Sequence, residues 1–488
     1  MKVLLVQPDW RQENFGFRLA AMPEPLGLET LAAALPDHDV RIADQRCGDD
    51  VAETVRSFQP DLVGVTALTP EVYAALEVLR QVKEIAPEVM TVAGGHHASL
   101  LPQDFACPQV DAVVLGEGEP VLAGLVEALQ CGRDLSTVAN LIYRDADGRF
   151  RATPRRVPRI NLDTSPLPRR DLVERHRHKY FFLFDQSDTS MSTGRGCPYR
   201  CSFCSVWEFY AGQTRAMSAE RVVAELKTLR TPHVTFIDDN FLLNHRRERR
   251  IADLIQAEGL GRRFSMECRT DSIVRHPDVV AKWVDIGLYA VLLGLEGSDA
   301  TLTSINKKNN VRTNDQAIRI LQDHGVIIWG AFLVDPDWSG DDFQRLREYV
   351  SLRGITHTQF TVLTPLPGTE LWRRNQDQLL TRDYTCFDAL HAVVPTRLPR
   401  EEFYRHLADL YRQTDLGPYY ELVRAGKLTL QDIQRGKEVL SAMSRWENYA
   451  ANDPVLREGP QSRYIGFGDP ARARLAPRTA RAPMVRES

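Results

Sequence analysis

Long apolar runs are absent from this chain of 488 residues. No stretch approaches the roughly 20 consecutive apolar residues that a transmembrane helix needs. The first residues, "KVLLVQP", predict a short apolar strand rather than a targeting leader. An excess of one charge is also missing, because the formal net charge is only −4. We therefore expect a cytoplasmic protein without a transmembrane segment, and no bulk electrostatic attraction to nucleic acid.

Cysteine is sparse outside one short segment. Five of the eight cysteines are scattered along the chain, at Cys47, Cys107, Cys131, Cys268 and Cys386. Scattered cysteines are typical of reduced thiols, and each of these five is best interpreted as a small buried apolar residue. The other three, Cys197, Cys201 and Cys204, lie close together in "GRGCPYRCSFCSVWEF", which begins at Gly194.

Strand-length apolar runs alternate with helical stretches over residues 1–150, which we interpret as one domain. The runs are "KVLLVQP", "DVRIAD", "DLVGVTA", "VMTVAGG" and "DAVVLG". This alternation predicts an α/β fold with a doubly wound, Rossmann-like parallel sheet, and the expected strand order is flavodoxin-like. Ligands of such sheets bind beyond the carboxyl ends of the strands. The segment "NLIYRDADGRFRAT" predicts a hairpin that turns at "DADG".

A second alternating series predicts a partial barrel over residues 189–383. Its runs are "SMSTGRG", "HVTFIDD", "RFSMECR", "AVLLGLE", "IIWGAFLV" and "HTQFTVLTP". Six β-α units are too few for an eight-fold barrel, so we expect a (β/α)6 TIM-type barrel, open on one side, with its chemistry at the carboxyl ends of the strands. Residues 151–188, rich in Pro and Arg, predict a linker. Residues 384–450 predict a helical extension, and residues 451–488, with few large apolar side chains, predict a disordered tail.

The three clustered cysteines match a group that accepts three thiolates. A structural zinc ion takes four ligands, whereas a cubane iron–sulfur cluster on three thiolates keeps one iron open. The alternatives are a zinc site completed by a distant histidine, and plain buried thiols. The segment resembles the radical S-adenosylmethionine (radical SAM) superfamily in three respects: its C-x3-C-x2-C spacing, its place directly after the first barrel strand, and Phe203 before the last cysteine.

This resemblance implies a [4Fe-4S] cluster on Cys197, Cys201 and Cys204, with Phe203 beside it. The open iron would bind SAM and, after reduction, split it to give a 5′-deoxyadenosyl radical. Residues at the ends of three later barrel strands stand where the superfamily holds SAM: Asp238, Asp239, Asn240, Glu267, Arg269, Gly294 and Glu296. Charged donors and acceptors suit a zwitterionic ligand, and the alternative is a set of salt bridges at the barrel mouth.

Two loops that contain glycine follow neighbouring strands of the first domain, "AGGHH" at 93–97 and "GEGE" at 116–119. Glycine allows the backbone to approach a ligand closely, but a flavin, a nucleotide or a plain tight turn would all use it. The whole domain, including "PLGLETLAAAL" and "VVLGEGEPVLAGLVEAL", resembles the cobalamin (B12)-binding domain that precedes many radical SAM cores. The resemblance implies cobalamin contacts at Thr66, Thr69, Gly94, Gly95, His96, Gly116 and Glu117.

The mutase-type cobalamin motif D-x-H-x-x-G is missing, since none of the twelve histidines stands in that pattern. We therefore expect cobalt without a lower histidine ligand, as is usual in the radical SAM branch. The runner-up for this domain is the flavodoxin-like domain of methylthiotransferases. That domain needs cluster cysteines after successive strands, and Cys47, Cys107 and Cys131 do not follow three successive strand ends.

Together the resemblances imply a cobalamin-dependent radical SAM C-methyltransferase that acts on an unactivated carbon. The region after the barrel core, including "NKKNN" and "TRDYTCFDALH", is most similar to hopanoid C-3 methylases. The alternatives are a cobalamin-dependent radical SAM cyclase of the Mg-protoporphyrin monomethyl ester type and a cofactor sensor without activity. The implied partners are a small-molecule or lipid substrate, an electron donor such as flavodoxin or ferredoxin, and the membrane surface as a peripheral contact.

An apolar substrate would need an apolar pocket. The aromatic candidates for its lining are Trp329, Phe332, Trp338 and Phe360. Large aromatic residues on barrel strands more often belong to the core, and that interpretation is favoured here.

Overall fold

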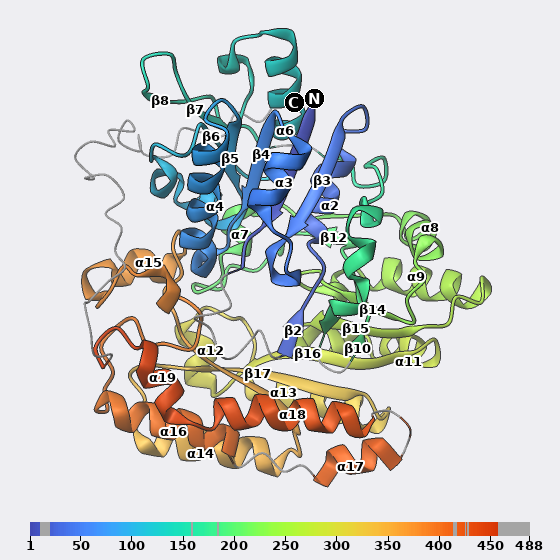
Figure 1. Cartoon of the computed structure of the whole chain (residues 1–488). Coiled ribbons are helices and arrows are strands. Elements are labelled where there is room, and N and C mark those ends of the chain that lie inside the picture. The colour runs from blue at the N-terminus through green and yellow to red at the C-terminus, as the bar shows by residue number, and fades with distance from the viewer. Residues whose placement is uncertain are drawn as a thin grey trace.

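The computed structural model describes residues 1–9, 20–157, 160–182, 185–412, 417–424, 426 and 429–456. Figure 1 shows two α/β units, with the blue N-terminal sheet above the green and yellow strands of the second unit. The orange and red C-terminal helices lie at the base. Residues from the carboxyl ends of both sets of strands line one shared cavity.

The N-terminal sheet has the flavodoxin-like order that the sequence predicts. Its parallel strands run in the order β3-β1-β4-β5-β6, and the predicted hairpin, β7 and β8, extends the β6 edge. Alternate residues of β1 face opposite layers: Leu4 and Val6 pack with α3 and α4, whereas Val3 and Leu5 pack with α2 and α6. The elements are β1 (Lys2–Gln7), α2 (Leu26–Ala33), β3 (Asp39–Asp44), α3 (Val51–Phe58), β4 (Leu62–Thr66), α4 (Val72–Ile85), β5 (Met90–Gly94), α5 (His96–Leu100), β6 (Ala112–Val114), α6 (Gly118–Cys131), β7 (Leu141–Arg144) and β8 (Phe150–Ala152).

The second unit is a six-stranded parallel sheet in chain order, with β11 at one edge and β18 at the other. This arrangement confirms a partial barrel that is open on one side. Four of its helices begin after Ser218, Asn244, Ser298 or Asn310, whose side chains accept a hydrogen bond from a first-turn amide. The elements are β11 (Thr189–Met191), α8 (Ala219–Thr228), β14 (His233–Phe236), α9 (His245–Ala257), β15 (Arg263–Cys268), α10 (Thr270–Arg275), α11 (Pro277–Asp285), β16 (Leu288–Glu296), α12 (Asp299–Ser304), α13 (Val311–Asp323), β17 (Ile327–Val334), α14 (Gly340–Leu352) and β18 (His357–Val362).

The first barrel strand is shorter than the sequence predicts. One strand is expected over 190–196, but β11 ends at Met191, and β12 (Gly194–Arg195) pairs instead with β13 (Arg215–Ala216) in a separate ribbon. The cause is the carboxylate of Asp238, which accepts hydrogen bonds from the amides of Thr193 (2.6 Å) and Gly194 (2.9 Å). These amides are therefore turned away from the sheet, and the cysteine segment starts from the ribbon.

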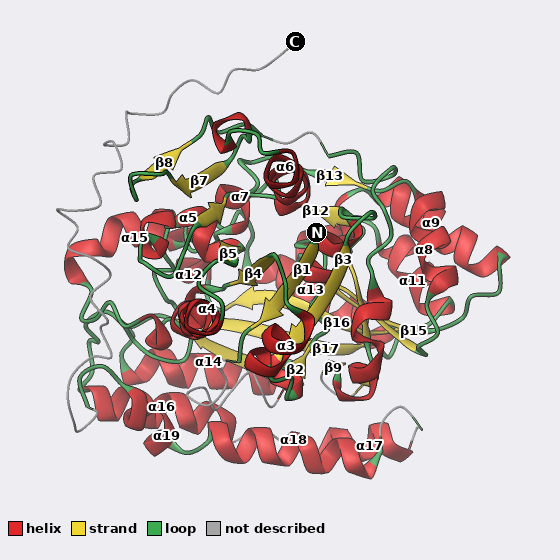
Figure 2. Ribbon diagram, turned by 45° about the horizontal axis from the view of Figure 1, so that its top comes forward, coloured by secondary structure: helices red, strands yellow, loops and turns green. Residues whose placement is uncertain are grey.

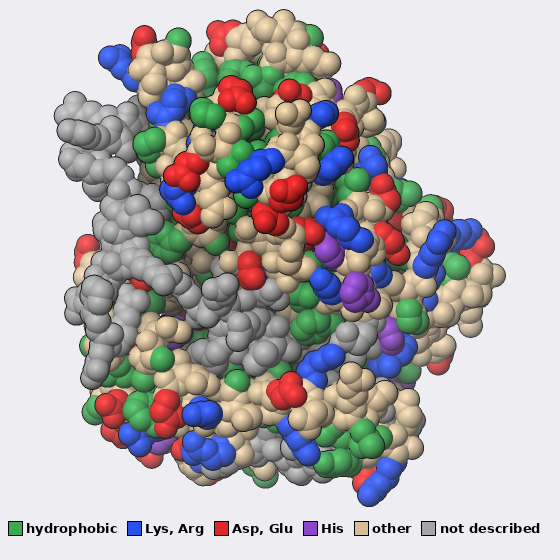
Figure 3. Space-filling model, in the orientation of Figure 1, with side chains coloured by type: hydrophobic (Ala, Val, Ile, Leu, Met, Phe, Trp, Pro, Cys, Tyr) green, Lys and Arg blue, Asp and Glu red, His purple; other side chains and the backbone are tan. Residues whose placement is uncertain are grey.

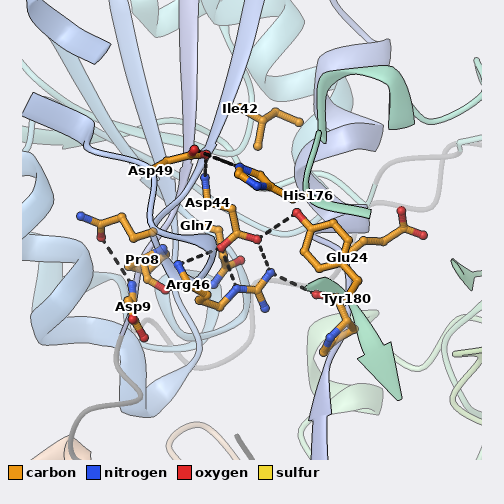
Figure 4. A network of polar contacts seen from close by, with 12 residues as sticks. Gln7, Pro8, Asp9, Glu24, Ile42, Asp44, Arg46, Asp49, His176 and Tyr180 are labelled. Atoms are coloured by element: carbon orange, nitrogen blue, oxygen red, sulfur yellow. Dashed lines mark hydrogen bonds and ion pairs between the residues drawn. The ribbon is translucent and has the colours of Figure 1, made fainter. Parts of the chain in front are cut away.

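Residues 151–188, predicted as a linker, contain short elements. The 3₁₀ helix η6 (Arg170–Lys179) is followed by β9 (Phe181–Phe182) and β10 (Asp185–Gln186), and β9 also pairs with β2 (Ala21–Met22). Figure 4 shows this segment against the first domain: His176 Nε2 lies 2.9 Å from the Asp49 carboxylate, and the Tyr180 hydroxyl donates to Asp44 over 3.2 Å. Pieces of two residues carry no periodicity, so a sequence pattern could not have indicated them.

The C-terminal extension is helical, as expected, but it also packs on the first domain. Trp372, Tyr384 and Phe387 belong to the same core as α3 and α4. Near the end of the extension, α18 and α19 follow each other closely, and α16 packs beside both (Figure 2). The elements are α15 (Glu370–Asn375), η9 (Tyr384–Cys386), α16 (Arg400–Arg412), α17 (Gly417–Arg424), α18 (Leu430–Met443) and α19 (Trp446–Asn452).

The predicted disordered tail, 451–488, is described only at its start. Asn452 ends α19, and the buried carboxylate of Asp453 pairs with Arg400, so these residues are ordered. Residues 457–488 lie outside the described part of the chain. Figure 3 shows acidic and basic side chains interspersed over one face of the molecule, in keeping with the small net charge. No helix among the described residues is long and apolar enough to cross a membrane.

Candidate active site between the two units

The cysteine segment leaves the ribbon strand β12 and ends at the short helix α7 (Val206–Phe209). All three of its cysteines are free thiols, with Cys201 buried and the other two partly buried. The middle of the segment is tied to the barrel, because the Ser202 amide donates to the Ile305 carbonyl (2.9 Å) and the Leu371 amide donates to the Ser202 carbonyl (2.8 Å). Phe203 packs against Ile305 in a small apolar cluster at the same place.

Asp238 and Asp239, which follow β14, brace the start of the cysteine segment. Besides the two amides given above, the buried carboxylate of Asp238 accepts a hydrogen bond from the Thr193 hydroxyl. Asp239 accepts from the amide of Gly196 over 3.0 Å, and burial raises the pKa of its carboxyl to about 6. Both aspartates therefore position the backbone just before Cys197, and their predicted contacts with SAM stay predictions.

Arg269, at the end of β15, clamps the loop between the first two cysteines. Its guanidinium lies 3.6 Å from the ring centroid of Tyr199, and its Nε donates to Asp271 over 2.9 Å. Asp271 in turn accepts from the Tyr199 hydroxyl at 3.2 Å. The Arg269 amide donates to Asn240 Oδ1 over 3.2 Å, which joins the ends of β14 and β15. A cation stacked on an aromatic ring and fixed by a carboxylate holds this loop in one position.

Glu296, at the end of β16, forms a buried ion pair with Lys307, a residue that the sequence analysis did not single out. Lys307 also donates to the Gly294 carbonyl over 2.7 Å. Gly294 leaves space for this contact, because a Cβ there would lie 2.6 Å from Glu296 Oε1. Lys307 comes from the loop after α12, in the "NKKNN" stretch, and only the fold brings it to the barrel mouth.

Glu267 faces the inside of the barrel. It alternates along β15 with Met266 and Cys268, which pack in the outer core with the helices. Although its side chain has exposed surface, it lies inside the barrel, and desolvation by the surrounding protein raises the pKa of its carboxyl to about 7, with smaller contributions from the charges of Asp239 and Glu296. Asp239, Glu267 and Glu296 thus bring carboxyl groups close to the buried ammonium group of Lys307 at the barrel mouth.

A cavity of 310 Å³ lies between the two units. Its apolar end is enclosed by α2, α6 and the sheet, and its polar end reaches the ribbon and the cysteine segment. Of the residues predicted to contact cobalamin, five line it: Thr66, Gly94, Gly95, Gly116 and Glu117. From the barrel unit, the lining includes Ser192, Gly194, Arg195, Phe209, Tyr210, Ile237 and Asp239.

Two predicted cobalamin contacts, Thr69 and His96, make other contacts in this structure. The Thr69 hydroxyl lies 3.1 Å from His97 Nδ1, and His97 Nε2 lies 3.0 Å from Asp104, which also accepts from Tyr384. This chain of contacts joins the first domain to the C-terminal extension. His96 Nε2 lies 2.8 Å from the hydroxyl of Ser205, the residue after the third cysteine.

The four aromatic candidates for an apolar pocket separate into two groups. Phe332, Phe360 and Trp338 belong to or pack against the core between the barrel and its helices. Trp329 points to the other face of β17 and packs against Phe182 of β9, with ring centroids 5.5 Å apart and 58° between the ring planes. Three of the four are therefore core residues, as the favoured interpretation holds.

Both units resemble domains of known proteins. A B12-binding domain model matches residues 18–126, and a radical SAM superfamily model matches residues 191–350. The hopanoid C-3 methylase of Methylococcus capsulatus is 33% identical over 397 residues, which cover 79% of this chain and 75% of that protein. The chain belongs to the cobalamin-dependent radical SAM methyltransferases.

Other relatives of this methyltransferase agree with that placement. An uncharacterized methyltransferase of Pyrococcus horikoshii is 32% identical over 406 residues, covering 80% of this chain and 87% of that protein. The cobalamin-dependent SAM radical enzyme OxsB, solved with aqua-cobalamin and SAM, has a TM-score of 0.68 at 15% identity and covers 92% of this chain and 79% of its own. TsrM from Kitasatospora setae has a TM-score of 0.62 at 20% identity and covers 77% and 76%. These two structures show the same fold.

The cysteine segment of the methyltransferase fits an iron–sulfur cluster. Burial raises the pKa of all three thiols, that of Cys204 to about 12, and repulsion from the other two thiolates adds to this for Cys204. Three thiols in one electrostatic environment need a cationic partner to ionise together, and a cluster supplies it. Among the described residues, no three His, Cys, Asp or Glu side chains converge closely enough to hold a single metal ion.

The cavity fits part of a cobalamin. Glycines form part of its wall, and side chains there would collide with neighbouring lining residues: a Cβ on Gly118 would lie 2.8 Å from Leu31 Cδ2, and a Cβ on Gly95 would lie 2.6 Å from the Thr66 hydroxyl. An apolar slot beside a sheet, with a polar mouth at the strand ends, suits a nucleotide tail. No histidine is among the described lining residues. When bound, the cluster with SAM supplies a radical, and cobalamin supplies a methyl group.

Proposed function

We propose that this methyltransferase methylates an unactivated carbon of a small-molecule or lipid substrate, and that C-3 of a hopanoid is the first candidate. The observation that carries the substrate proposal is the likeness to the hopanoid C-3 methylase, which extends beyond the two matched domain models. The cavity supports the reaction type, because it brings the cobalamin loops and the start of the cysteine segment into one space.

In this proposal the barrel mouth holds SAM. Asp239, Glu267 and the Glu296–Lys307 pair present both charges that a zwitterionic amino acid group requires. Asp239 lies between the cavity and the cysteine segment, since it lines the cavity and also accepts a hydrogen bond from the amide of Gly196. The chain's own task is to orient SAM toward the cavity and to exclude water from the space between the two cofactors.

The test uses the full chain, reconstituted anaerobically with iron, sulfide, cobalamin and SAM. With substrate and a chemical or flavodoxin-type reductant, 5′-deoxyadenosine and S-adenosylhomocysteine should form in roughly equal amounts. Methyl-deuterated SAM should transfer its label to the product. Stimulation of SAM cleavage by triterpenoids supports the hopanoid candidate, whereas stimulation only by soluble polar compounds overturns it. Deoxyadenosine without label in the product overturns methyl transfer to carbon.

A second candidate is an oxidative ring closure. It is favoured by relatives named anaerobic magnesium-protoporphyrin IX monomethyl ester cyclase, of which that of Rubrivivax gelatinosus is 28% identical and covers 85% of this chain. A cyclase would release deoxyadenosine without matching S-adenosylhomocysteine. The mass of the product separates the two functions, because methylation adds one CH2 unit and cyclisation does not.

Location and redox partner follow from this proposal. The electron donor would be a flavodoxin or ferredoxin, and a lipid substrate would be met at the membrane surface by peripheral contact from the cytoplasm. Ultracentrifugation with substrate-containing vesicles tests the contact, and remaining in the supernatant would oppose it.

A further inference from the structure

The cysteine segment is anchored at both ends to the first domain. At its start, Arg195 pairs with Glu117 (Nη1 to Oε1, 2.6 Å) and with Glu119 (Nη2 to Oε1, 2.6 Å). At its end, Ser205 Oγ lies 2.8 Å from His96 Nε2. The two glutamates follow β6 and His96 follows β5. Both anchors therefore come from the loops at the carboxyl ends of the N-terminal strands.

The anchors are largely shielded from solvent. Glu117 binds a second arginine, since Arg215 Nη2 lies 2.7 Å from its Oε2, and their side chains are 6% and 18% exposed. Arg195 and Arg215 stand opposite each other in the β12–β13 ribbon. The ring of His96 stacks on Phe209, with centroids 4.6 Å apart and 9° between the planes. Shielded, charge-assisted contacts of this kind hold their geometry better than exposed ion pairs do.

The same loops form the wall of the 310 Å³ cavity. The loops after β5 and β6 line it with Gly94, Gly95, Gly116, Glu117, Gly118 and Glu119. Arg195 and Phe209 line it from the other side. A molecule that fills the cavity therefore touches groups that hold the cysteine segment in place. Conversely, a cluster that fixes the segment also fixes one wall of the cavity.

We propose that this anchor set (His96, Glu117, Glu119, Arg195, Ser205 and Arg215) couples the two cofactor sites, so that cluster and cobalamin each strengthen the binding of the other. Coupling between two binding sites is reciprocal, and about 5- to 150-fold is typical. Ser205 and Arg215 are positioning residues, because both lie outside the cavity lining. Arg215 acts through Glu117, which lines the cavity, and Ser205 acts through His96, whose neighbour Gly95 lines it. The inference concerns the cofactor pair and not the methyl acceptor, so it stands or falls separately from the proposed reaction.

The test compares cobalamin dissociation constants of the full chain with and without the cluster. Hydroxocobalamin is titrated by absorbance into the reconstituted protein and into the variant in which all three cysteines are replaced by alanine. The same pair is made with Arg215→Met and Ser205→Ala together. A matched control carries Arg250→Met and Ser57→Ala, which remove an exposed ion pair and an exposed helix hydroxyl far from the anchors. Iron content with and without cobalamin gives the reciprocal measurement.

The wild-type chain and the control should bind cobalamin at least 5-fold more tightly with the cluster, in the range typical of coupled sites. In the anchor variant, the ratio of the cobalamin dissociation constant without the cluster to that with the cluster should fall to near one. Its affinity for cobalamin without the cluster should stay within about 2-fold of that of the wild-type chain without the cluster. Arg215→Lys, which keeps the charge, should restore part of the ratio. Equal affinities with and without the cluster in the wild-type chain overturn the proposal. An unchanged ratio in the anchor variant overturns it as well. If the double variant does not fold, Arg215→Met alone takes its place, and an unchanged ratio there has the same meaning.

Discussion

The ammonium group of Lys307 lies 2.7 Å from the carbonyl oxygen of Gly294 and also pairs with the carboxylate of Glu296. These three residues place a buried cation near the cysteine segment, where the charge of Lys307 opposes the rise that burial causes in the pKa of Cys201. The contact depends on the absence of a side chain at Gly294. Lys307 thus joins the loop after α12 to the end of β16. It can do so only because Gly294 has no Cβ, which would collide with the ion pair.

Gly294→Ala should displace Lys307 without unfolding the barrel. The new Cβ would lie 2.6 Å from Glu296 Oε1, so the ion pair must shift. We expect SAM binding to the reconstituted protein to weaken by about 10-fold, an effect of roughly 1.4 kcal/mol. Equilibrium dialysis with labelled SAM measures it, and Gly261→Ala, at an exposed position with open space around it, is the control. Unchanged affinity for SAM would show that this ion pair lies outside the SAM site.

Lys307→Met should destabilise the fold more than the paired change does. Removing one partner of a buried ion pair leaves the other charge unpaired, which costs about 3 to 5 kcal/mol, and both side chains here are 8% exposed. Lys307→Met with Glu296→Gln removes both charges, so its free energy of unfolding should lie closer to that of the wild type. Urea denaturation of the wild type and the two variants measures the difference. A double variant as unstable as the single one would show that the pair does not act as a unit.

The cysteines and the order of both sheets could be predicted because the signals are local. The spacing of Cys197, Cys201 and Cys204 lies within one short segment, and most strands of the two sheets are apolar runs, the short first barrel strand β11 being the exception. Lys307 could not be predicted, because its partner Glu296 lies across a helix and no motif relates the two. Sequence alone indicated which loops face the cavity but not what each side chain contacts, so the contacts of Thr69 with His97 and of His96 with Ser205 could not be predicted.

The aromatic residues show a signal that the sequence did contain. Trp329 and Phe332 are three positions apart on one strand, so the two-residue period of a strand puts them on opposite faces. The structure has them so, with Phe332 in the core and Trp329 against Phe182. The partner Phe182 could not be foreseen, because β9 is two residues long and has no period.

Each of Cys197→Ala, Cys201→Ala and Cys204→Ala should abolish SAM cleavage and leave the fold largely intact. The segment lies at the mouth of the barrel, and its middle is held by backbone hydrogen bonds to Ile305 and Leu371 that need no thiol. Circular dichroism should show a melting temperature within a few degrees of the wild type. Iron and sulfide analysis gives the cluster content. Tightly bound zinc, with unfolding on its removal, would contradict the cluster assignment.

Gly94→Leu should weaken cobalamin binding by at least about 10-fold, because the new side chain would occupy the cavity that Gly94 lines. The β5 backbone tolerates the change: a Cβ at Gly94 meets only Val114, at an ordinary 3.7 Å. Iron content after reconstitution should stay at the wild-type level without cobalamin. With cobalamin present it should fall only by the part that cobalamin binding contributes to cluster binding. Gly261→Leu, in open space on the surface, is the matched control. Unaltered cobalamin affinity would place the cofactor elsewhere.

His96 should make the protein less stable in acid. Burial lowers the pKa of this imidazole to about 4, with a smaller contribution from neighbouring His97, whereas an unfolded histidine titrates near about 6.5. Between these values the unfolded chain binds more protons than the folded chain, so the free energy of unfolding must fall as the pH is lowered from about 6.5 to about 4. The contribution of His96 is at most about 3 kcal/mol, which corresponds to the full shift.

His96→Gln keeps a polar side chain near Ser205 but cannot titrate, and its stability should therefore decrease less over this range. Urea denaturation at pH 7 and pH 5 on both proteins isolates the His96 contribution, because the other titrating groups, including the buried His357, are common to the two. Parallel pH dependence in wild type and variant would mean that His96 titrates at the same pH in the folded and unfolded chains, and that its contact with Ser205 does not depend on a neutral ring.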